Sequence, residues 1–335
     1  MNIKDKKLTS IPTNVITGFL GSGKTSTILH LLKQKPANER WAVLVNEFGE
    51  IGVDGSFIEA QTGNSPNIFV QEVSGGCMCC SSGLTMQVAL NQLLNEAKPH
   101  RLLIEPTGLG HPVEVLQTLS NKYYKGVLSL EKTITLVDAR NLSNKRYTEH
   151  SIFNQQLHIA DIIVGSKCDL YSDINQQVLL DYVKSENIPC ESIVFIKHGE
   201  LELSLLTGKT SSNEQGTHHS HNLKNSKSKS IDKIPKTGFI KALNQGEGFQ
   251  SIGWHFTSEK IFDRSKLLTF INSINVIRLK GIFVTSAGIY GYNVTDDEVT
   301  EIKLDTCTES RIEIICDQID DSWESVLLNT LNKKQ

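Results

Sequence analysis

The stretch "GFLGSGKTS", Gly18–Ser26, follows the predicted strand Asn14–Thr17 and precedes a segment with helical spacing. It matches the pattern G-x-x-x-x-G-K-[ST]. Glycines let such a loop curl until its backbone N–H groups converge on phosphate oxygens, and the positive end of the following helix adds to the attraction. We therefore predict a phosphate-binding loop whose contacts come from Gly18, Gly21, Ser22, Gly23, Lys24, Thr25 and Ser26.

A magnesium–nucleotide site needs particular side chains beside this loop. Lys24 is expected to reach the β- and γ-phosphates, and the Thr25 hydroxyl is expected to bind Mg²⁺. In "RLLIEPTG" a carboxylate, Glu105, ends a mainly apolar run. We predict that Glu105 contacts Mg²⁺ through water, and the alternative is a glutamate that caps the next helix.

The segment "GSKCDL" resembles the guanine-reading motif [NT]-K-x-D, with Lys167 and Asp169 at its last defined positions. An aspartate there can accept hydrogen bonds from the N1–H and 2-amino groups of guanine, which adenine does not offer. Ser166 stands where Asn is usual. The pattern therefore favours guanine over adenine as the base.

The first 200 residues alternate short apolar runs with helical patterns, which is typical of a parallel sheet covered by helices. We predict an α/β fold: a P-loop GTPase domain over residues 1–206, a flexible histidine-containing linker over 207–236, and a smaller C-terminal α+β domain over 237–335. The predicted strands of the first domain are Asn14–Thr17, Trp41–Val45, Ile68–Val73, Arg101–Glu105, Thr133–Val137, Asp161–Gly165 and Ser192–Ile196.

The loop "GGCMCC", residues 75–80, gathers three of the seven cysteines of the chain. Cys77, Cys79 and Cys80 can reach one metal only if the backbone turns, and the two glycines before them give that freedom. Zn²⁺ takes four ligands, so water, another side chain or a partner's residue would complete the site. Thiolates also suit Cu(I), and a redox dithiol or buried core thiols are the alternatives to a metal site.

The composition excludes several classes of protein. The net charge is −3 and the pI is about 6.4, so neither nucleic acid nor an anionic membrane is expected as a partner. No apolar run approaches the roughly 18 residues of a membrane span, and the first residues lack the apolar core of a signal peptide. A cytoplasmic location is therefore expected, where cysteines more often bind metal or react than form disulfides.

The tract "HHSH" places three imidazoles in the predicted linker: His218, His219 and His221. A mobile imidazole cluster can collect Zn²⁺, Ni²⁺ or Co²⁺ and pass it inward. The alternative is a polar run in a loop under little constraint.

The segments "GFLGSGKTS", "NEFGEIGVDG", "GGCMCC", "IEPTGLGHP" and "SKCDL" resemble, in this order, the CobW-type branch of the metallochaperone GTPases. The resemblance covers most of the chain. It implies slow GTP hydrolysis that metal modulates, Zn²⁺ at the C-x-C-C motif, and delivery of metal to a client protein that the sequence does not identify. It also implies a water- or metal-positioning role for Glu47 and accessory metal contacts from Glu50 and His111.

The leading hypothesis is a GTPase switch in which GTP binding and hydrolysis couple to capture and release of zinc. One alternative is a passive zinc reservoir or sensor whose fold the nucleotide stabilises. Another is a P-loop phosphotransferase with a redox-active cysteine loop. The physiological metal and the oligomeric state, including a homo-oligomer, are left open.

Overall fold

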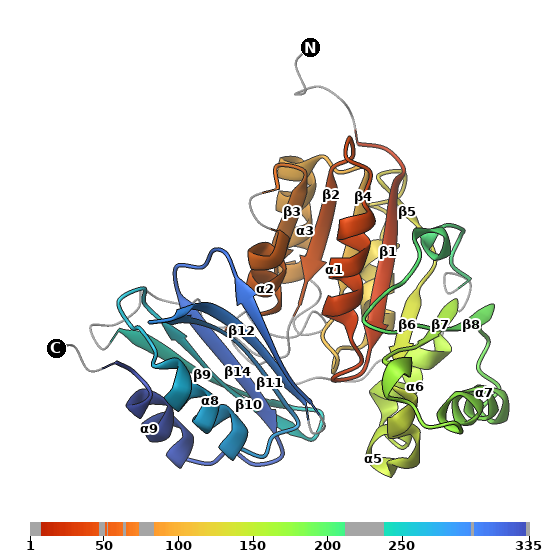
Figure 1. Cartoon of the computed structure of the whole chain (residues 1–335). Coiled ribbons are helices and arrows are strands. Elements are labelled where there is room, and N and C mark those ends of the chain that lie inside the picture. Colours follow the sequence, from red (N-terminus) through yellow and green to blue (C-terminus); the bar gives the residue numbers. More distant parts are fainter. Residues whose placement is uncertain are drawn as a thin grey trace. The chain divides into compact units, whose positions relative to one another are not determined.

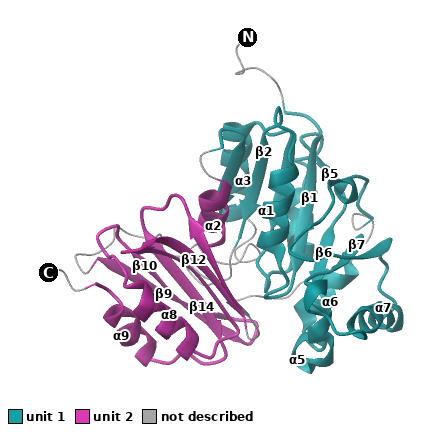
Figure 2. Cartoon of the chain, viewed as in Figure 1, with its two compact units in different colours: residues 1–46, 65–73, 77–227 teal, residues 47–64, 74–76, 228–335 magenta. Residues whose placement is uncertain are grey.

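The computed structural model describes residues 8–46, 51, 53–62, 65–73, 84–211, 238–295 and 298–332 (Figure 1). The chain forms two compact units (Figure 2). Of the described residues, 8–46, 65–73 and 84–211 belong to unit 1, and 51, 53–62, 238–295 and 298–332 belong to unit 2. The predicted domain boundaries at 206 and 237 border the undescribed stretch 212–237 and stay a prediction.

Unit 1 is built on a sheet of strand order β3-β2-β4-β1-β6-β7-β8, with β5 paired to β1. Every pairing is parallel. Strands β2, β4, β6 and β7 are mainly apolar runs, as expected for strands that helices cover on both faces. The strands are β1 Ile11–Gly18, β2 Trp41–Val45, β3 Ile68–Glu72, β4 Arg101–Glu105, β5 Leu128–Leu130, β6 Ile134–Val137, β7 Ile162–Gly165 and β8 Ser192–Phe195.

The helices of unit 1 cover this sheet with their apolar sides. In α3, Leu90, Leu93, Leu94 and Ala97 share one face, as their spacing predicts, and all four are buried in the core with residues of β2 and β4. The elements are α1 Lys24–Gln34, α3 Leu84–Ala97, α4 Pro112–Leu119, α5 Lys145–Thr148, α6 Ser151–His158 and α7 Asn175–Ser185, with short 3₁₀ turns η2 Ala139–Ser143, η3 Cys168–Leu170 and η4 Leu203–Leu206.

The predicted fold class is confirmed, with small differences at strand ends. All seven predicted strands form. Strand β5 is an additional strand, which its three residues were too few to predict. Two predicted strands begin one residue later than expected. The reason is local, because the Thr133 N–H donates to the Asp161 carboxylate at 2.7 Å before the ladder between β6 and β7 begins.

Unit 2 is a mainly antiparallel α+β domain, as the sequence predicts. Its sheet has the order β13-β12-β11-β14-β10-β9. Its core is rich in aromatic rings that meet edge to face, such as Phe256 with Phe262 and Phe262 with Phe283. The elements are β9 Phe239–Gly246, β10 Phe249–Phe256, α8 Arg264–Ser273, β11 Arg278–Thr285, β12 Gly288–Thr295, β13 Glu298–Leu304, β14 Ser310–Cys316 and α9 Ser322–Asn329. Within the described ranges, no helix has the length and hydropathy of a membrane span.

Helix α2, Asp54–Thr62, belongs to unit 2 although it lies between β2 and β3 in the sequence (Figure 2). Glycines of the sheet make room for an apolar side chain of α2 and for Ile51, which precedes the helix. A Cβ added to Gly253 would lie 2.5 Å from Ile51, and one added to Gly291 would lie 2.6 Å from Phe57. Larger residues at these strand positions would therefore displace the segment that carries α2.

A buried ion cluster fixes α2 to the sheet. Asp54 is 3% exposed, and the Arg278 guanidinium donates to both of its carboxylate oxygens at 3.1 Å. The Lys280 ammonium also contacts Asp54. Breaking a buried pair leaves an uncompensated charge, which costs roughly 3–5 kcal/mol. The helix is therefore held by charge as well as by apolar packing.

Glu313 completes this cluster from β14, opposite Lys280 in the strand register. Burial, and after it the Asp54 charge, raise the pKa of Glu313 to about 7. Arg278, Lys280 and a hydrogen bond from Ser251 act in the opposite direction without offsetting the burial. The folded chain therefore binds a proton at Glu313 that the unfolded chain releases near its ordinary pKa of 4.5.

This difference predicts a pH dependence of stability. Because the folded-state pKa of Glu313 is raised, its stabilising contribution is complete below about pH 4.5 and is lost as the pH rises through about 7. We expect the free energy of unfolding of the wild type, relative to Glu313→Gln, to fall between pH 4.5 and pH 8. Denaturant unfolding of both proteins across this range measures it, and parallel pH profiles would contradict the assignment.

Candidate nucleotide site

The predicted phosphate-binding loop connects β1 to α1, and its glycines have the conformations that the motif requires. Gly18, Gly21 and Gly23 all have positive φ values, of 143°, 72° and 92°. A Cβ at Gly18 would lie 2.5 Å from the Leu136 carbonyl oxygen and 2.6 Å from Ser22 Oγ, so space as well as φ excludes a side chain. Gly23 has open space around it, and only its left-handed conformation, directly before α1, favours glycine.

The Lys24 side chain folds back across this loop. Its ammonium donates to the carbonyl oxygens of Gly18 at 2.8 Å and Phe19 at 3.2 Å, and the residue is buried. The positive charge of Lys24 is therefore held next to the backbone of the phosphate-binding loop. That charge suits the terminal phosphates of a nucleotide, which is the predicted role of Lys24.

Thr25 and Glu105, the two predicted magnesium-site residues, meet at the edge of the sheet. The Thr25 hydroxyl donates to Glu105 Oε1 at 2.9 Å, and both side chains are buried. The alternative role of Glu105 as a helix cap is wrong, because α4 begins only at Pro112 and His111 occupies its N-cap position. A hydroxyl paired with a carboxylate is an oxygen donor set of the kind that Mg²⁺ prefers.

Several buried polar groups around the loop have no hydrogen-bond partner among the described residues. They include Ser22 Oγ in the loop itself and both side-chain polar atoms of Asn46, which is 1% exposed directly after β2. Burying such groups without a partner costs free energy, so they are expected at a site that a polar ligand completes. The residues present therefore fit a phosphate-bearing ligand with Mg²⁺. Sequence reasoning gave Asn46 no role.

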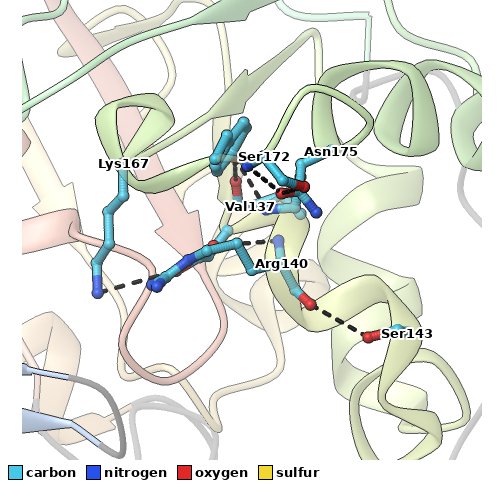
Figure 3. Close-up of polar contacts among 9 residues, drawn as sticks. Val137, Arg140, Ser143, Lys167, Ser172 and Asn175 are labelled. Atoms are coloured by element: carbon cyan, nitrogen blue, oxygen red, sulfur yellow. Dashed lines mark hydrogen bonds and ion pairs between the residues drawn. The ribbon is translucent and has the colours of Figure 1, made fainter.

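The predicted base-reading segment follows β7. Lys167 has a left-handed backbone (φ 57°), and η3 then presents Asp169 as an exposed residue. The Lys167 ammonium lies 3.9 Å from the carboxylate of Asp138, which Arg140 holds through two hydrogen bonds of 2.9 and 2.6 Å (Figure 3). Guanine selection by Lys167 and Asp169 stays a prediction.

Asp138 and Tyr171 are neighbours of this segment that sequence reasoning missed. The Ala139 N–H donates to the Tyr171 hydroxyl at 2.9 Å, and that hydroxyl donates to the Val137 carbonyl at 3.3 Å. Burial raises the pKa of Tyr171 well above its ordinary value, so it stays a neutral donor. The signal for Asp138 was present, since it follows the apolar strand β6 just as Glu105 ends β4.

The predicted metal ligands lie mostly beyond the described residues. Glu47, Glu50, Cys77, Cys79, Cys80, His218, His219 and His221 all fall outside the described ranges. His111 is described, and its Nδ1 lies 3.4 Å from Gln155 Oε1. Within the described ranges no three His, Cys, Asp or Glu side chains form a metal-binding group. The zinc site therefore stays a prediction.

The parallel sheet, the loop between β1 and α1, and the paired Thr25 and Glu105 define a P-loop nucleotide-binding protein. The sequence model of the "CobW/HypB/UreG, nucleotide-binding domain" matches residues 12–191, which is more than half of the chain. The chain belongs to the CobW/HypB/UreG family, and the predicted resemblance to its CobW-type branch is confirmed.

Two curated relatives and one solved structure show what this chain is similar to. The chain is 39% identical over 308 residues to Zinc chaperone YeiR of Escherichia coli (strain K12), covering 90% of this chain and 92% of that protein. It is 28% identical over 223 residues to Zinc chaperone CobW of Sinorhizobium sp, covering 59% and 62% of the two chains. The crystal structure of Zn(II)-bound YjiA GTPase from E. coli is 18% identical, with a TM-score of 0.43 over 96% of this chain and 99% of that chain.

The close approach at Gly18 yields a test of the loop. Gly18→Ala places a Cβ against the Leu136 backbone and is expected to weaken GDP binding at least about tenfold. Gly126→Ala is the matched control, because Gly126 also has a positive φ (84°) but nothing within 4 Å of the added Cβ. Fluorescent-nucleotide titration measures both variants. Equal GDP affinities in the two variants would show that the close approach does not shape the site.

Proposed function

We propose that this protein is a zinc-binding GTPase that acts as a metallochaperone. GTP binding and slow hydrolysis to GDP and phosphate would control capture of Zn²⁺ and its transfer to a client metalloprotein. The observation that carries the proposal is the hydrogen bond between Thr25 and Glu105 beside the Lys24 ammonium, in a chain 39% identical to a zinc chaperone. The names of other relatives, such as "Zinc-regulated GTPase metalloprotein activator 1" of Schizosaccharomyces pombe, support it further.

The loop and the sheet edge would supply the groups that hold the phosphates and Mg²⁺ for GTP hydrolysis. The loop residues from Gly18 to Ser26 would hold the phosphates, with Lys24 on the β- and γ-phosphates. Thr25 and Glu105 would hold Mg²⁺, which neutralises the charge that develops on the phosphates. Catalysis of phosphoryl transfer is chiefly positioning and charge stabilisation, so these groups can act without a covalent intermediate.

Zinc is the proposed cargo rather than a resident cofactor. Cys77, Cys79 and Cys80 are its proposed ligands, with Glu50, His111 and the three linker histidines as further candidates. The cysteine loop follows β3 in the sequence, and β3 runs parallel to β1 and β4 in one sheet. The carboxyl ends of parallel strands share one edge of a sheet. This placement supports a cargo site next to the nucleotide.

The separation of the two sites gives the first experiment. Lys24→Ala is expected to lower the rate of GTP hydrolysis about 10²–10³-fold, because it removes the one ammonium predicted to act on the transferring phosphate. Zinc affinity should stay within about twofold of the wild type. Phosphate release and chelator competition under reducing conditions measure the two activities. Lys33→Ala is the matched control, since Lys33 is exposed on the same helix.

The converse variant tests the cargo site. Replacing Cys77, Cys79 and Cys80 together by serine is expected to abolish tight zinc binding and to preserve GDP binding. Cys190→Ser is the control, because Cys190 is a partly buried free thiol outside the loop. Unchanged zinc affinity in the triple variant would refute the proposed ligands. Transfer of the γ-phosphate to an acceptor other than water would favour a phosphotransferase instead.

A further inference from the structure

The turn that follows β4 touches the phosphate-binding loop directly. This turn, residues 106–110, begins immediately after Glu105 and ends before α4. A Cβ added to Gly108 would lie 3.0 Å from the Leu20 backbone nitrogen and 3.1 Å from the Phe19 carbonyl carbon. The Gly108 backbone thus packs against the loop backbone without an intervening side chain. A displacement of this turn must therefore disturb the loop.

Gln156 of α6 holds the same glycine from the other side. Its Nε2 donates to the Gly108 carbonyl oxygen at 3.0 Å, and the side chain is only 1% exposed. The Gln156 backbone is itself fixed, because the Thr135 hydroxyl on β6 donates to its carbonyl oxygen at 2.7 Å. The amide therefore links the central sheet to the turn through one short side chain.

Helices α5 and α6 also contact the loop through aromatic rings. The Phe19 ring lies 4.9 Å from the His150 ring, 5.2 Å from Tyr147 and 6.0 Å from Phe153, measured between centroids. The two consecutive helices α5 and α6 thus pack on the phosphate-binding loop at Phe19, and α6 also contacts the turn at Gly108. They set the position of the loop relative to the turn.

Burial of the Gln156 amide costs free energy of folding that a purely structural role does not explain. Its Oε1 is buried and has no hydrogen-bond partner within the described part of the chain. A buried amide that makes one hydrogen bond and leaves another atom unsatisfied gains little over an apolar side chain of similar volume. This cost in folding free energy is explained if the hydrogen bond to Gly108 has a role in the nucleotide site as well as in stability.

We propose that Gln156 is a positioning residue that fixes the Gly108 peptide so that the turn after Glu105 reads the terminal phosphate of the nucleotide. The inference rests on the proposed GTPase function. Lys24 and the Thr25–Glu105 pair place the terminal phosphate and Mg²⁺ beside the first residue of this turn. Gln156 thereby determines how strongly the site distinguishes GTP from GDP and how fast it hydrolyses GTP.

The test compares Gln156→Leu with Thr13→Val in the full-length chain. Leucine keeps most of the volume and removes the donor, so the affinity for a non-hydrolysable GTP analogue and kcat should each fall about tenfold. The KM for GTP should rise in step with the loss of analogue affinity, because hydrolysis is slow relative to dissociation, and GDP affinity should change less than about threefold. Thr13→Val also removes a buried hydrogen bond from a side chain to a backbone carbonyl, at the amino end of β1. It should leave both nucleotide affinities, kcat and KM unchanged.

The outcomes separate this inference from the proposed function. If the wild type neither binds nor hydrolyses GTP, the proposed function fails and the inference fails with it. If the wild type hydrolyses GTP and Gln156→Leu matches Thr13→Val, only the inference is overturned. Should Gln156→Leu not fold, hydrogen exchange of the wild type decides. The Leu109 and Gly110 amides must exchange more slowly with the GTP analogue than with GDP, and equal rates overturn the proposal.

Discussion

The hydrogen bond from Thr25 to Glu105 joins the two parts of unit 1 on which the candidate site depends. It ties the first turn of α1, which follows the phosphate-binding loop, to the carboxyl end of β4. It can form because β1 and β4 are neighbours in a parallel sheet, so that both strands end at the same edge. The loop, the buried ammonium of Lys24 and the turn at Gly108 are all arranged around this contact.

The chain connects the carboxyl edge of this sheet to unit 2. The chain leaves unit 1 after Asn46, supplies α2 to unit 2, and returns to form β3. The ion pairs of Asp54 with Arg278 and Lys280 fix α2 to the sheet of unit 2. The segment that starts at the carboxyl end of β2, beside Glu105, therefore carries a helix that is held on the sheet of unit 2. The segment that contains α2 is joined at one end to β2 and at the other to β3, which are both strands of the nucleotide-binding sheet.

Local sequence was enough to predict the parts of the site whose geometry is set by a few adjacent residues. Gly18 and Gly23 occupy positive-φ positions that their motif requires, and Glu105 could be found because apolar runs that alternate with helical patterns predict parallel strands. The C-terminal α+β domain was predicted from its strand patterns in the same way.

The remaining features depend on contacts between distant residues. Arg278 is 224 positions from Asp54, and nothing in "VDGSFIEA" distinguishes a helix of unit 2 from one of unit 1. Gln156 stands 48 positions from Gly108, and a buried glutamine on a short helix has no characteristic sequence pattern. Asp138 was accessible to the reasoning that found Glu105, since both lie at the ends of buried strands.

In the proposed function, nucleotide and zinc control each other's binding. Thermodynamic linkage requires that an effect of nucleotide on zinc affinity be matched by an equal effect of zinc on nucleotide affinity. The most direct measurement is zinc affinity by chelator competition, under reducing conditions, with Mg²⁺ and either a non-hydrolysable GTP analogue or GDP. The proposed function predicts affinities that differ by about tenfold or more, which corresponds to about 1.4 kcal/mol of coupling. Equal zinc affinities in the two nucleotide states would contradict it.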